Sequence, residues 1–433
     1  MTEHDDIVDL LHRAVDPAPA GDEQIAATAA AARRHRMARR TAAVMAVAAV
    51  LAIALVVPWD ARPTRVDLVD RPATPAPVRP SWHGLPDAPL DPRWGAFATV
   101  SGDGLLVWGG YVSAEGVAEG PRDDGAVYGN GRWSALPDGP LAPRMRMGGA
   151  AGWIEQVERD GTAGREYWIV GGTGGADGRT SLQDAAAYRP QDSGDGQWHE
   201  LPAVPEPIIA GTVVGGEAMV AVGLDTDGGR ALYELRPGDR QWRTLVPSLP
   251  SPPAIDNSDL QVLAAGDHLI VVGQGAMFVT PASESGGGGL RWQRVAAPDG
   301  ARTLDNVRGA VADRARDAVV VLLSDGTYRY DLVAREWSRI AGGLQPDPPQ
   351  PIPLVRTADD ALVAVDVVGG QVHALVGDDG WTALPPLDGS RVDAAVQAVE
   401  PSVRGLGDVV VWGGMGTQEA SPQGVMLARR AQR

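Results

Sequence analysis

Seven tryptophans recur through this chain of 433 residues at intervals of 44 to 65 residues, each near the end of a short apolar run. They are Trp82, Trp133, Trp198, Trp242, Trp292, Trp337 and Trp381. A unit of about fifty residues that holds several short strands cannot bury both faces of its own sheet, so copies must pack side by side around an axis. The spacing therefore predicts a circular repeat protein, whose function is limited to what a repeat scaffold can display.

The sequence around each tryptophan follows one pattern. An apolar run that ends in glycine comes first, then a run with an aromatic residue, then the tryptophan run. The first two complete copies comprise 104–110, 125–128 and 132–137, then 167–172, 185–188 and 197–202. Short apolar or β-branched runs separated by Gly, Asp and Pro are typical of antiparallel strands, and each copy offers four strand candidates.

This pattern resembles the kelch repeat of the galactose-oxidase-like β-propellers, in which a double glycine ends the second strand and tyrosine and tryptophan mark the third and fourth. The glycine pair occurs at Gly109-Gly110, Gly171-Gly172 and Gly413-Gly414, whereas the third and fourth copies keep only Gly223 and Gly273. The resemblance covers residues 81–428. It implies an all-β, seven-bladed kelch-like β-propeller, a fold that hosts many unrelated activities.

The two ends of the repeat region are incomplete. Residues 409–414 and 424–427 supply the second and third strands of a seventh unit, but no tryptophan strand follows them, and residues 429–433 form a short tail. Residues 81–86, around Trp82, stand ahead of any first or second strand. We therefore expect residues 81–86 to form the outer strand of the last blade, which closes the ring and leaves only short edges exposed.

A seventeen-residue stretch without charge, residues 41–57, precedes the repeat region and predicts a transmembrane helix at 41–58. Five arginines crowd its N-terminal flank, so the positive-inside rule predicts a single-pass protein of the cell membrane with residues 1–40 cytoplasmic and the propeller extracytoplasmic. A cleaved signal peptide and a buried soluble helix are the alternatives. Recovery of a mature form that begins near Trp59 would indicate cleavage.

The remaining segments outside the repeats carry less information. Residues 1–40 contain apolar residues at helical spacing, which predicts a short cytoplasmic helical tail. Five prolines between residues 59 and 80 predict a stiff linker. This layout is similar to that of actinobacterial membrane proteins with a short cytoplasmic head, among them anti-sigma factors, and it leaves open a sensor in which the tail relays a signal.

Composition excludes some classes of partner and of site. The formal net charge of −17 argues against nucleic acid, because phosphate binding depends on basic patches. The chain has no cysteine, and therefore no disulfide and no tyrosine–cysteine crosslink of the kind that copper oxidases of this resemblance use. The repeat-region histidines His83, His199, His268 and His373 lie near different strands, so we expect no metal site, no cofactor and no catalytic residue.

One group of residues survives as a candidate site. Arg93, Arg144, Arg302 and Arg391 each follow a tryptophan by ten or eleven residues, in the connection to the next innermost strand. If these connections gather at one mouth of the central channel, the arginines could bind a carboxylate or a phosphate there, with the loops at 111–123 and 173–183 on the rim. The alternative is structural, with each arginine paired to an acidic residue.

These observations favour a membrane-anchored extracytoplasmic binding or scaffold protein for a protein or a cell-envelope saccharide. A carbohydrate-acting enzyme of the mutarotase type is the alternative from another class, although no acid–base pair identifies one. The transmembrane sensor is the third.

Overall fold

The computed structural model describes residues 80–428. The segments left out of that range are 103, 115–116, 158–162, 176–177, 192–195, 215, 225–228, 247–259, 274, 282–291, 300–303, 305–306, 347–349, 378–379, 400–406 and 416–423. The expectations for the tail at 1–40, the span at 41–58, nearly all of the linker at 59–80 and the end at 429–433 therefore lie outside the described residues. Within the described range, no helix has the length and apolarity needed to cross a membrane.

The described chain folds into β-strands, most of them arranged as antiparallel meanders of four. The first strands of these sheets are β3 (Phe97–Ser101), β9 (Arg144–Val157), β14 (Ile208–Val214), β18 (Gln261–Ala265), β22 (Val307–Asp313), β26 (Leu354–Arg356) and β30 (Ala395–Ala398). The second strands are β4 (Gly104–Trp108), β10 (Ala163–Gly174), β15 (Ala218–Leu224), β19 (His268–Gly273), β23 (Ala318–Leu323), β27 (Leu362–Val365) and β31 (Val409–Trp412).

The third and fourth strands complete each sheet. The third strands are β7 (Gly125–Gly129), β12 (Ala185–Arg189), β16 (Arg230–Leu235), β20 (Ala276–Pro281), β24 (Gly326–Asp331), β28 (Val372–Leu375) and β32 (Gly424–Ala428). The fourth are β8 (Arg132–Ala135), β13 (Gln197–Leu201), β17 (Arg243–Val246), β21 (Gln293–Val295), β25 (Glu336–Gly342), β29 (Trp381–Ala383) and β1 (Ser81–Gly84). Four short strands lie outside this scheme: β2 (Arg93–Trp94), β5 (Tyr111–Ala114), β6 (Val117–Pro121) and β11 (Thr180–Ser181).

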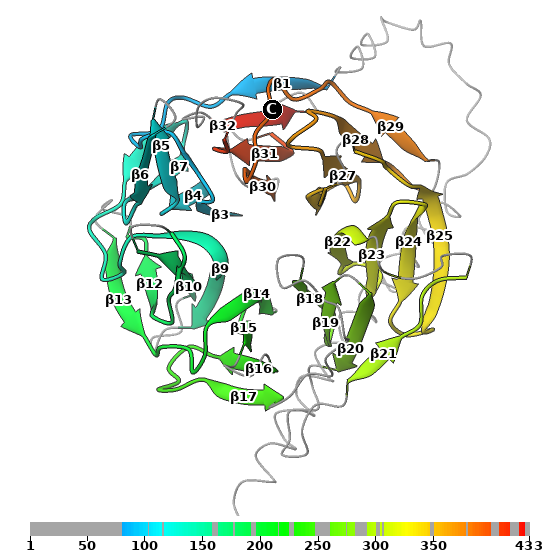
Figure 1. The fold of residues 1–433 in the computed structure, drawn as a ribbon, viewed down its shortest axis with the longest axis horizontal. Helices are drawn as coiled ribbons and strands as arrows, with labels where there is room; N and C mark the ends of the chain where they lie inside the picture. The colour runs from blue at the N-terminus through cyan, green and yellow to red at the C-terminus, as the bar shows by residue number, and fades with distance from the viewer. Residues whose placement is uncertain are drawn as a thin grey trace, which may run out of the picture. The chain divides into compact units, whose positions relative to one another are not determined.

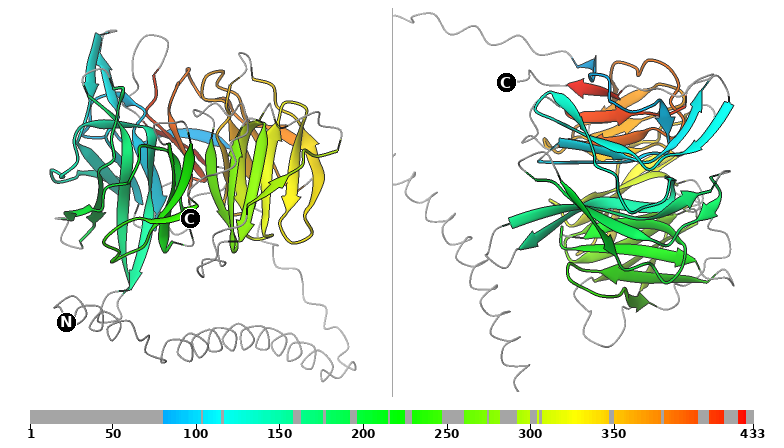
Figure 2. Two further views of the ribbon diagram at one scale, coloured as in Figure 1. Left: turned by 60° about the horizontal axis from the view of Figure 1, so that its bottom comes forward. Right: turned by 90° about the vertical axis from the view of Figure 1, so that its left-hand side faces the viewer.

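The sheets are arranged in a closed ring. Each first strand contacts the first strand of the next sheet, in the order β3, β9, β14, β18, β22, β26, β30 and back to β3. Figure 1 shows these strands nearest the centre and β13, β17, β21, β25, β29 and β1 on the outside. Figure 2 shows the same sheets from the side, with the twist that β-sheets normally have. The prediction of an all-β propeller is confirmed.

The ring is closed by a strand from the N-terminal side of the repeats. β1 pairs antiparallel with β32, with Trp82 opposite Leu427, so the last sheet has the order β1-β32-β31-β30. The position expected for the outer strand at residues 81–86 is the one that β1 occupies. No peptide connection joins β32 to β1 along the ring, so hydrogen bonds and side-chain packing alone hold the sheet together at that point.

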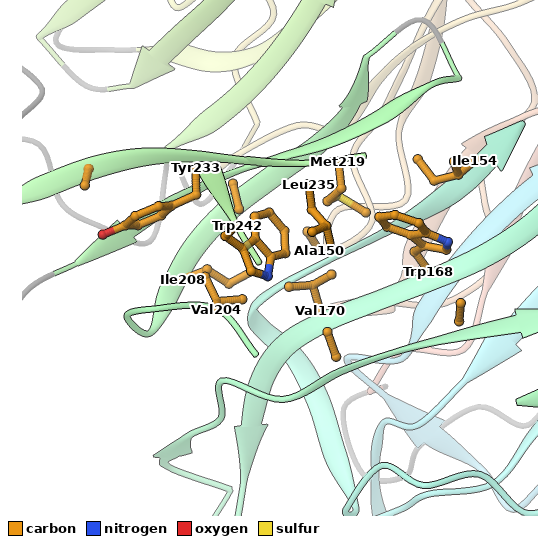
Figure 3. Close-up of a cluster of buried hydrophobic side chains, with 14 residues drawn as sticks. Ala150, Ile154, Trp168, Val170, Val204, Ile208, Met219, Tyr233, Leu235 and Trp242 are labelled. Carbon is orange, nitrogen blue, oxygen red and sulfur yellow. The ribbon is translucent and has the colours of Figure 1, made fainter. Parts of the chain in front are cut away.

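Second strands read as unbroken apolar runs because neighbouring sheets cover both of their faces. Every residue of β4, β23 and β31 is buried, whereas β8 on the outside is mostly exposed. The core is accordingly divided into clusters between adjacent sheets. Figure 3 shows one of them, in which Trp168 and Val170 of β10 lie close to Met219 of β15. Close packing between faces of this kind is the main source of the stability of the fold.

The outer tryptophans explain the period of the sequence. In the described part of the chain, six of them donate a hydrogen bond from Nε1 to a main-chain carbonyl of the preceding sheet's outer connection. The acceptors are Pro385 for Trp82, Pro86 for Trp133, Pro137 for Trp198, Pro202 for Trp242, Ala296 for Trp337 and Gly342 for Trp381. Each acceptor lies four or five residues after the preceding tryptophan. Each tryptophan therefore joins its own sheet to the previous one.

The double glycines form a second link between sheets. Gly109 and Gly110 both have positive φ, which L-residues with side chains rarely adopt. Gly110 N donates to the main-chain oxygen of Arg144 at 2.8 Å, and a Cβ on Gly109 would lie 2.7 Å from that same oxygen. Gly414 binds the oxygen of Arg93 in the same way. Glycine is required here by both the backbone conformation and the close approach of the next sheet.

Candidate functional site

The first of the predicted site residues, Arg93, is part of the scaffold. Its side chain is completely buried and forms a bidentate pair with Asp124, at 2.5 and 3.1 Å. Nε donates to the oxygen of Asp91, and Nη1 also donates to the oxygen of Gly109. The guanidinium therefore ties the connection before β3 to the loop between β4 and β7.

Arg144 repeats this arrangement in the next sheet. It is completely buried, pairs bidentately with Asp184 at 2.8 and 2.5 Å, and donates to the oxygens of Ala142 and Gly171. Because its own oxygen accepts from Gly110, Arg144 connects two sheets. The guanidinium groups of Arg93 and Arg144 are therefore both paired with aspartates of the scaffold, as the structural alternative expects.

Of the other two predicted arginines, only Arg391 is among the described residues. Arg391 is buried, and burial lowers the pKa of its guanidinium while Asp388 opposes the change. Its main-chain N donates to the oxygen of Val367 in the preceding sheet. Arg302 lies outside the described residues. Among the described residues, Arg93, Arg144 and Arg391 are all buried and do not form one open site.

The inner strands present other side chains at the same end of the ring. The ladders of β9, β14 and β22 are each interrupted near the start of the strand. In β9 the break lies between Met145 and Gly149, opposite Gly171 and Thr173 of β10. In β14 it lies between Ile208 and Ala210, and in β22 between Val307 and Gly309. A β-bulge of this kind leaves a residue unpaired and redirects its side chain. Arg146 and Arg308 lie in two of these bulges.

Arg146 belongs to the interrupted part of β9, and Figure 1 shows β9 among the strands on the inside of the ring. Its side chain is exposed to solvent, yet the protein atoms around it lower the pKa of the guanidinium, with Asp393 opposing the change. The two facts agree if solvent reaches the side chain through the opening while protein surrounds it on the other sides. Its main-chain N donates to the oxygen of Gly95, and Gly95 in turn binds the oxygen of Asp393. No carboxylate of the described residues forms an ion pair with Arg146.

Arg308 occupies the equivalent bulge of β22. It is half-buried, and its Nε has no hydrogen-bond partner among the described residues. Its main-chain oxygen accepts from Ile352 N, which places it beside the start of β26. An unsatisfied charged donor is costly to bury, so Nε of Arg308 is an unusual group in this interior.

Aromatic and apolar side chains accompany these arginines. The rings of Trp94 and Tyr111 lie 5.2 Å apart, in the small sheet formed by β2, β5 and β6. A Cβ on Gly178 would contact Tyr111, so the loops within 111–123 and 173–183 approach each other. Met147, beside Arg146, is 61% exposed. An opening with cations and apolar surface suits a ligand that has both an acidic group and a carbon framework.

The sequence contains a local signal for two of these bulges. Gly148 and Gly309 follow Met147 and Arg308 directly, and an isolated glycine inside a strand indicates a bulge. Strict alternation along β9 would place Arg144 and Arg146 on the same face. The bulge separates them, because it shifts the register between one arginine and the rest of the strand.

The residues do not fit a copper or zinc centre. His83, His199, His268 and His373 lie on β1, β13, β19 and β28, which belong to four different sheets. Among the described residues, no three side chains of His, Cys, Asp or Glu gather closely enough to hold a metal ion. Metal ligands must converge on one point, so these histidines cannot act together.

No family model and no curated protein sequence matches the chain. Solved structures do match. A fungal alcohol oxidase of the AA5 family, in complex with copper, superimposes with a TM-score of 0.58 at 13% identity, over 80% of this chain and 76% of the oxidase. A streptogramin B lyase (TM-score 0.49, 12% identity, 80% and 98% covered) and virginiamycin B lyase from Staphylococcus aureus (0.49, 13%, 80% and 99%) are also similar. At such identities the likeness concerns the fold alone, which is that of the β-propellers.

Proposed function

We propose that this protein is a binding propeller that recognises an acidic ligand at the end of the ring where the inner strands begin. The observation that carries the proposal is the pair of bulges that turn Arg146 and Arg308 out of the ladder, neither of them in an ion pair among the described residues. Arginine binds carboxylate and phosphate groups through fixed, charge-assisted hydrogen bonds. A cell-envelope saccharide with carboxylate groups, or an acidic segment of a protein, has the required chemistry.

The wider setting belongs to the same proposal. We take each four-stranded meander as one blade, which makes the propeller seven-bladed, and we take its repeats as kelch-like because of the glycine pairs and outer tryptophans. The apolar span at 41–57, with arginines before it, favours a single-pass membrane protein that holds the propeller outside the cell. A rigid ring with variable loops at one end is a suitable scaffold for binding there.

The proposal can be tested by measuring how the purified full-length protein binds hyaluronate, a carboxylated polysaccharide, with dextran as the uncharged comparison. Replacement of Arg146 or Arg308 by alanine should weaken hyaluronate binding by roughly ten- to a hundredfold, because one charge-assisted hydrogen bond contributes roughly 1.5–3 kcal/mol. Binding should also weaken as salt is raised.

Arg132→Ala is the matched control, since Arg132 is an exposed arginine on the outer strand β8. It should leave hyaluronate binding unchanged. Equal affinities for hyaluronate and dextran, or equal losses in Arg132→Ala and Arg146→Ala, would contradict the proposal.

A further inference from the structure

The sheets that begin with β3 and β9 each enclose an arginine at the same place. In both, the guanidinium binds the main-chain oxygen of a glycine near the C-terminal end of the second strand and the carboxylate of the aspartate that precedes the third. Arg93 thus binds Gly109 O and Asp124, and Arg144 binds Gly171 O and Asp184. We refer to this place, between the end of the second strand and the start of the third, as the arginine slot.

In the sheet that begins with β26, the chain supplies no arginine for the slot. The connection between β25 and β26, residues 343–353, contains glycine, proline, glutamine, leucine, isoleucine and aspartate but no arginine. A cavity of about 180 Å³ opens at the corresponding place. Its wall includes Asp366, which follows β27, and Gln371, which precedes β28. The cavity is many times larger than the about 10–15 Å³ that one water-sized probe needs.

Asp366 gives the cavity a negative group. It is only 5% exposed. Its Oδ1 accepts hydrogen bonds from Val368 N, Gly369 N and Gln350 Nε2, which fix the orientation of the carboxylate. Its Oδ2 has no hydrogen-bond partner among the described residues. The carboxylate is therefore held in place with one oxygen still able to accept.

The other polar groups of the wall are neutral. His373 is half-buried beside Asp366, and burial lowers the pKa of its imidazole although Asp366 opposes the change. Burial therefore favours the neutral form of the ring. The side chains of Gln345 and Gln371 add neutral amide groups, and Leu344 and Ile352 add apolar surface. The described wall thus has one negative charge, several acceptors and no cation.

We propose that this cavity binds a guanidinium group, supplied by the arginine side chain of a partner protein or by a free guanidinium compound. The chain itself encloses guanidinium groups at this place in two other sheets. The carboxylate now comes from the residue after the second strand rather than from the residue before the third, so the charge is retained at a neighbouring position. The inference stands apart from the channel-mouth proposal, because different residues and the opposite ligand charge are involved.

Two other classes of ligand fit the cavity less well. An anion would lie against the Asp366 carboxylate without a compensating cation in the described wall. A divalent metal ion needs more ligands than one carboxylate and one imidazole provide. A neutral ligand could use the amides and the histidine, but it would leave the buried carboxylate without a counter-charge.

The test is a titration of the purified full-length protein with N-acetyl-L-arginine amide, followed by calorimetry and ligand-observed NMR. The citrulline analogue has nearly the same shape without the charge, and the lysine analogue has the charge without the planar fork. We expect millimolar binding of the arginine compound and at least tenfold weaker binding of the other two. A short arginine-containing peptide should bind more tightly than the free compound if a protein is the natural source.

Four variants make the result decisive. Asp366→Asn should abolish binding, whereas Asp331→Asn, which alters a similar turn with Asp331 Oδ1 bound to Val333 N and Ala334 N, should not. Gln350→Arg should place an arginine of the chain in the cavity, which would prevent binding of the compound and raise the melting temperature. Arg146→Ala should leave binding of the arginine compound unchanged. A failure of the guanidinium proposal is therefore distinguishable from a failure of the proposed acidic-ligand site.

Equal binding of the arginine and citrulline compounds would overturn the inference in favour of a neutral ligand. Unchanged binding in Gln350→Arg would also overturn it, even if Asp366→Asn failed to fold. Absence of any binding by the wild-type protein at tens of millimolar would have the same effect.

Discussion

At the scale of single residues, paired burial explains why arginine recurs at the start of the inner strands. Arg93 and Arg144 are completely buried, whereas their partners Asp124 and Asp184 keep 49% and 45% of their side-chain exposure. Only a guanidinium can bind a carboxylate bidentately and still donate to two main-chain oxygens. Removal of the aspartate would leave a buried charge with carbonyl partners alone.

We expect Asp184→Ala to lower the free energy of unfolding by roughly 1.5–3 kcal/mol, because a buried charged donor loses its carboxylate while water at the half-exposed site replaces part of it. Denaturant unfolding measures this change. The exposed Asp138 has no such partner, and Asp138→Ala should stay within about 0.5 kcal/mol of wild type. A loss as small in Asp184→Ala as in Asp138→Ala would contradict the structural role.

The second residue-scale prediction concerns His373. Its pKa should lie below the ordinary histidine value of 6.5, since burial disfavours the imidazolium. Asp366→Asn should lower this pKa further, because the carboxylate is the group that raises it. NMR titration of the ring measures both. If Asp366→Asn raised the pKa, the proximity of the two groups would be wrong.

The same shift has a consequence for stability. The unfolded chain binds this proton more tightly than the folded one, so the contribution of His373 is fully present above about 6.5. It declines as pH falls from that value toward the lower folded pKa. The pH-dependence of wild type relative to His373→Asn should therefore show a deficit on the acidic side.

At the scale of elements, the strands of every sheet follow one another along the chain except in the last sheet, where no peptide connection joins β32 to β1. There the Trp82 hydrogen bond to Pro385 O and the ladder with β32 carry the closure. The same tryptophan bond elsewhere, as from Trp133 to Pro86 O, supports a covalent link that already exists. Opening of the ring should therefore begin at β1.

We expect Trp82→Phe to raise the unfolding rate more than Trp133→Phe, although each variant loses one hydrogen bond of about 1 kcal/mol at equilibrium. Stopped-flow unfolding in denaturant compares the two. Equal rates would mean that the ring does not open at this strand. Deletion of residues 81–86 should have a larger effect, with a marked drop in melting temperature.

At the scale of the whole molecule, the ring of sheets explains how a chain without cysteine or a single large core holds its shape. Each sheet is buried on both faces by its neighbours, so the core consists of separate clusters that become complete only when the ring closes. One of these clusters contains residues from both ends of the described range, among them Leu85 and Trp412. Stability and closure are therefore one property.

The prediction at this scale concerns topology. Arginines before residue 41 and the apolar span after it should place the propeller outside the cell, so protease added to intact cells should remove the propeller and spare the first forty residues. Antibodies to either end would follow the two fragments on a gel. Protection of the propeller would reverse the topology.

The sequence by itself determined the all-β propeller class, because the tryptophan period and the apolar runs reflect local requirements that recur in every sheet. It also pointed to the strand at Trp82, since one copy of the pattern lacked its last strand and another segment had one to spare. Glycine pairs could be recognised because positive φ depends on residue type at a single position.

Only the tertiary structure decided which arginines form ion pairs and which do not. Nothing local in the sequence shows that Arg93 and Arg144 form ion pairs and that Arg146 and Arg308 do not. The pairs with Asp124 and Asp184 are contacts across 31 and 40 residues. The exposure of Arg146 depends on a bulge that shifts strand register. The cavity at Asp366 likewise brings together residues of three separate segments, 343–352, 364–366 and 371–373. Burial, register and pairing are set by residues distant in sequence, so local pattern could not determine them.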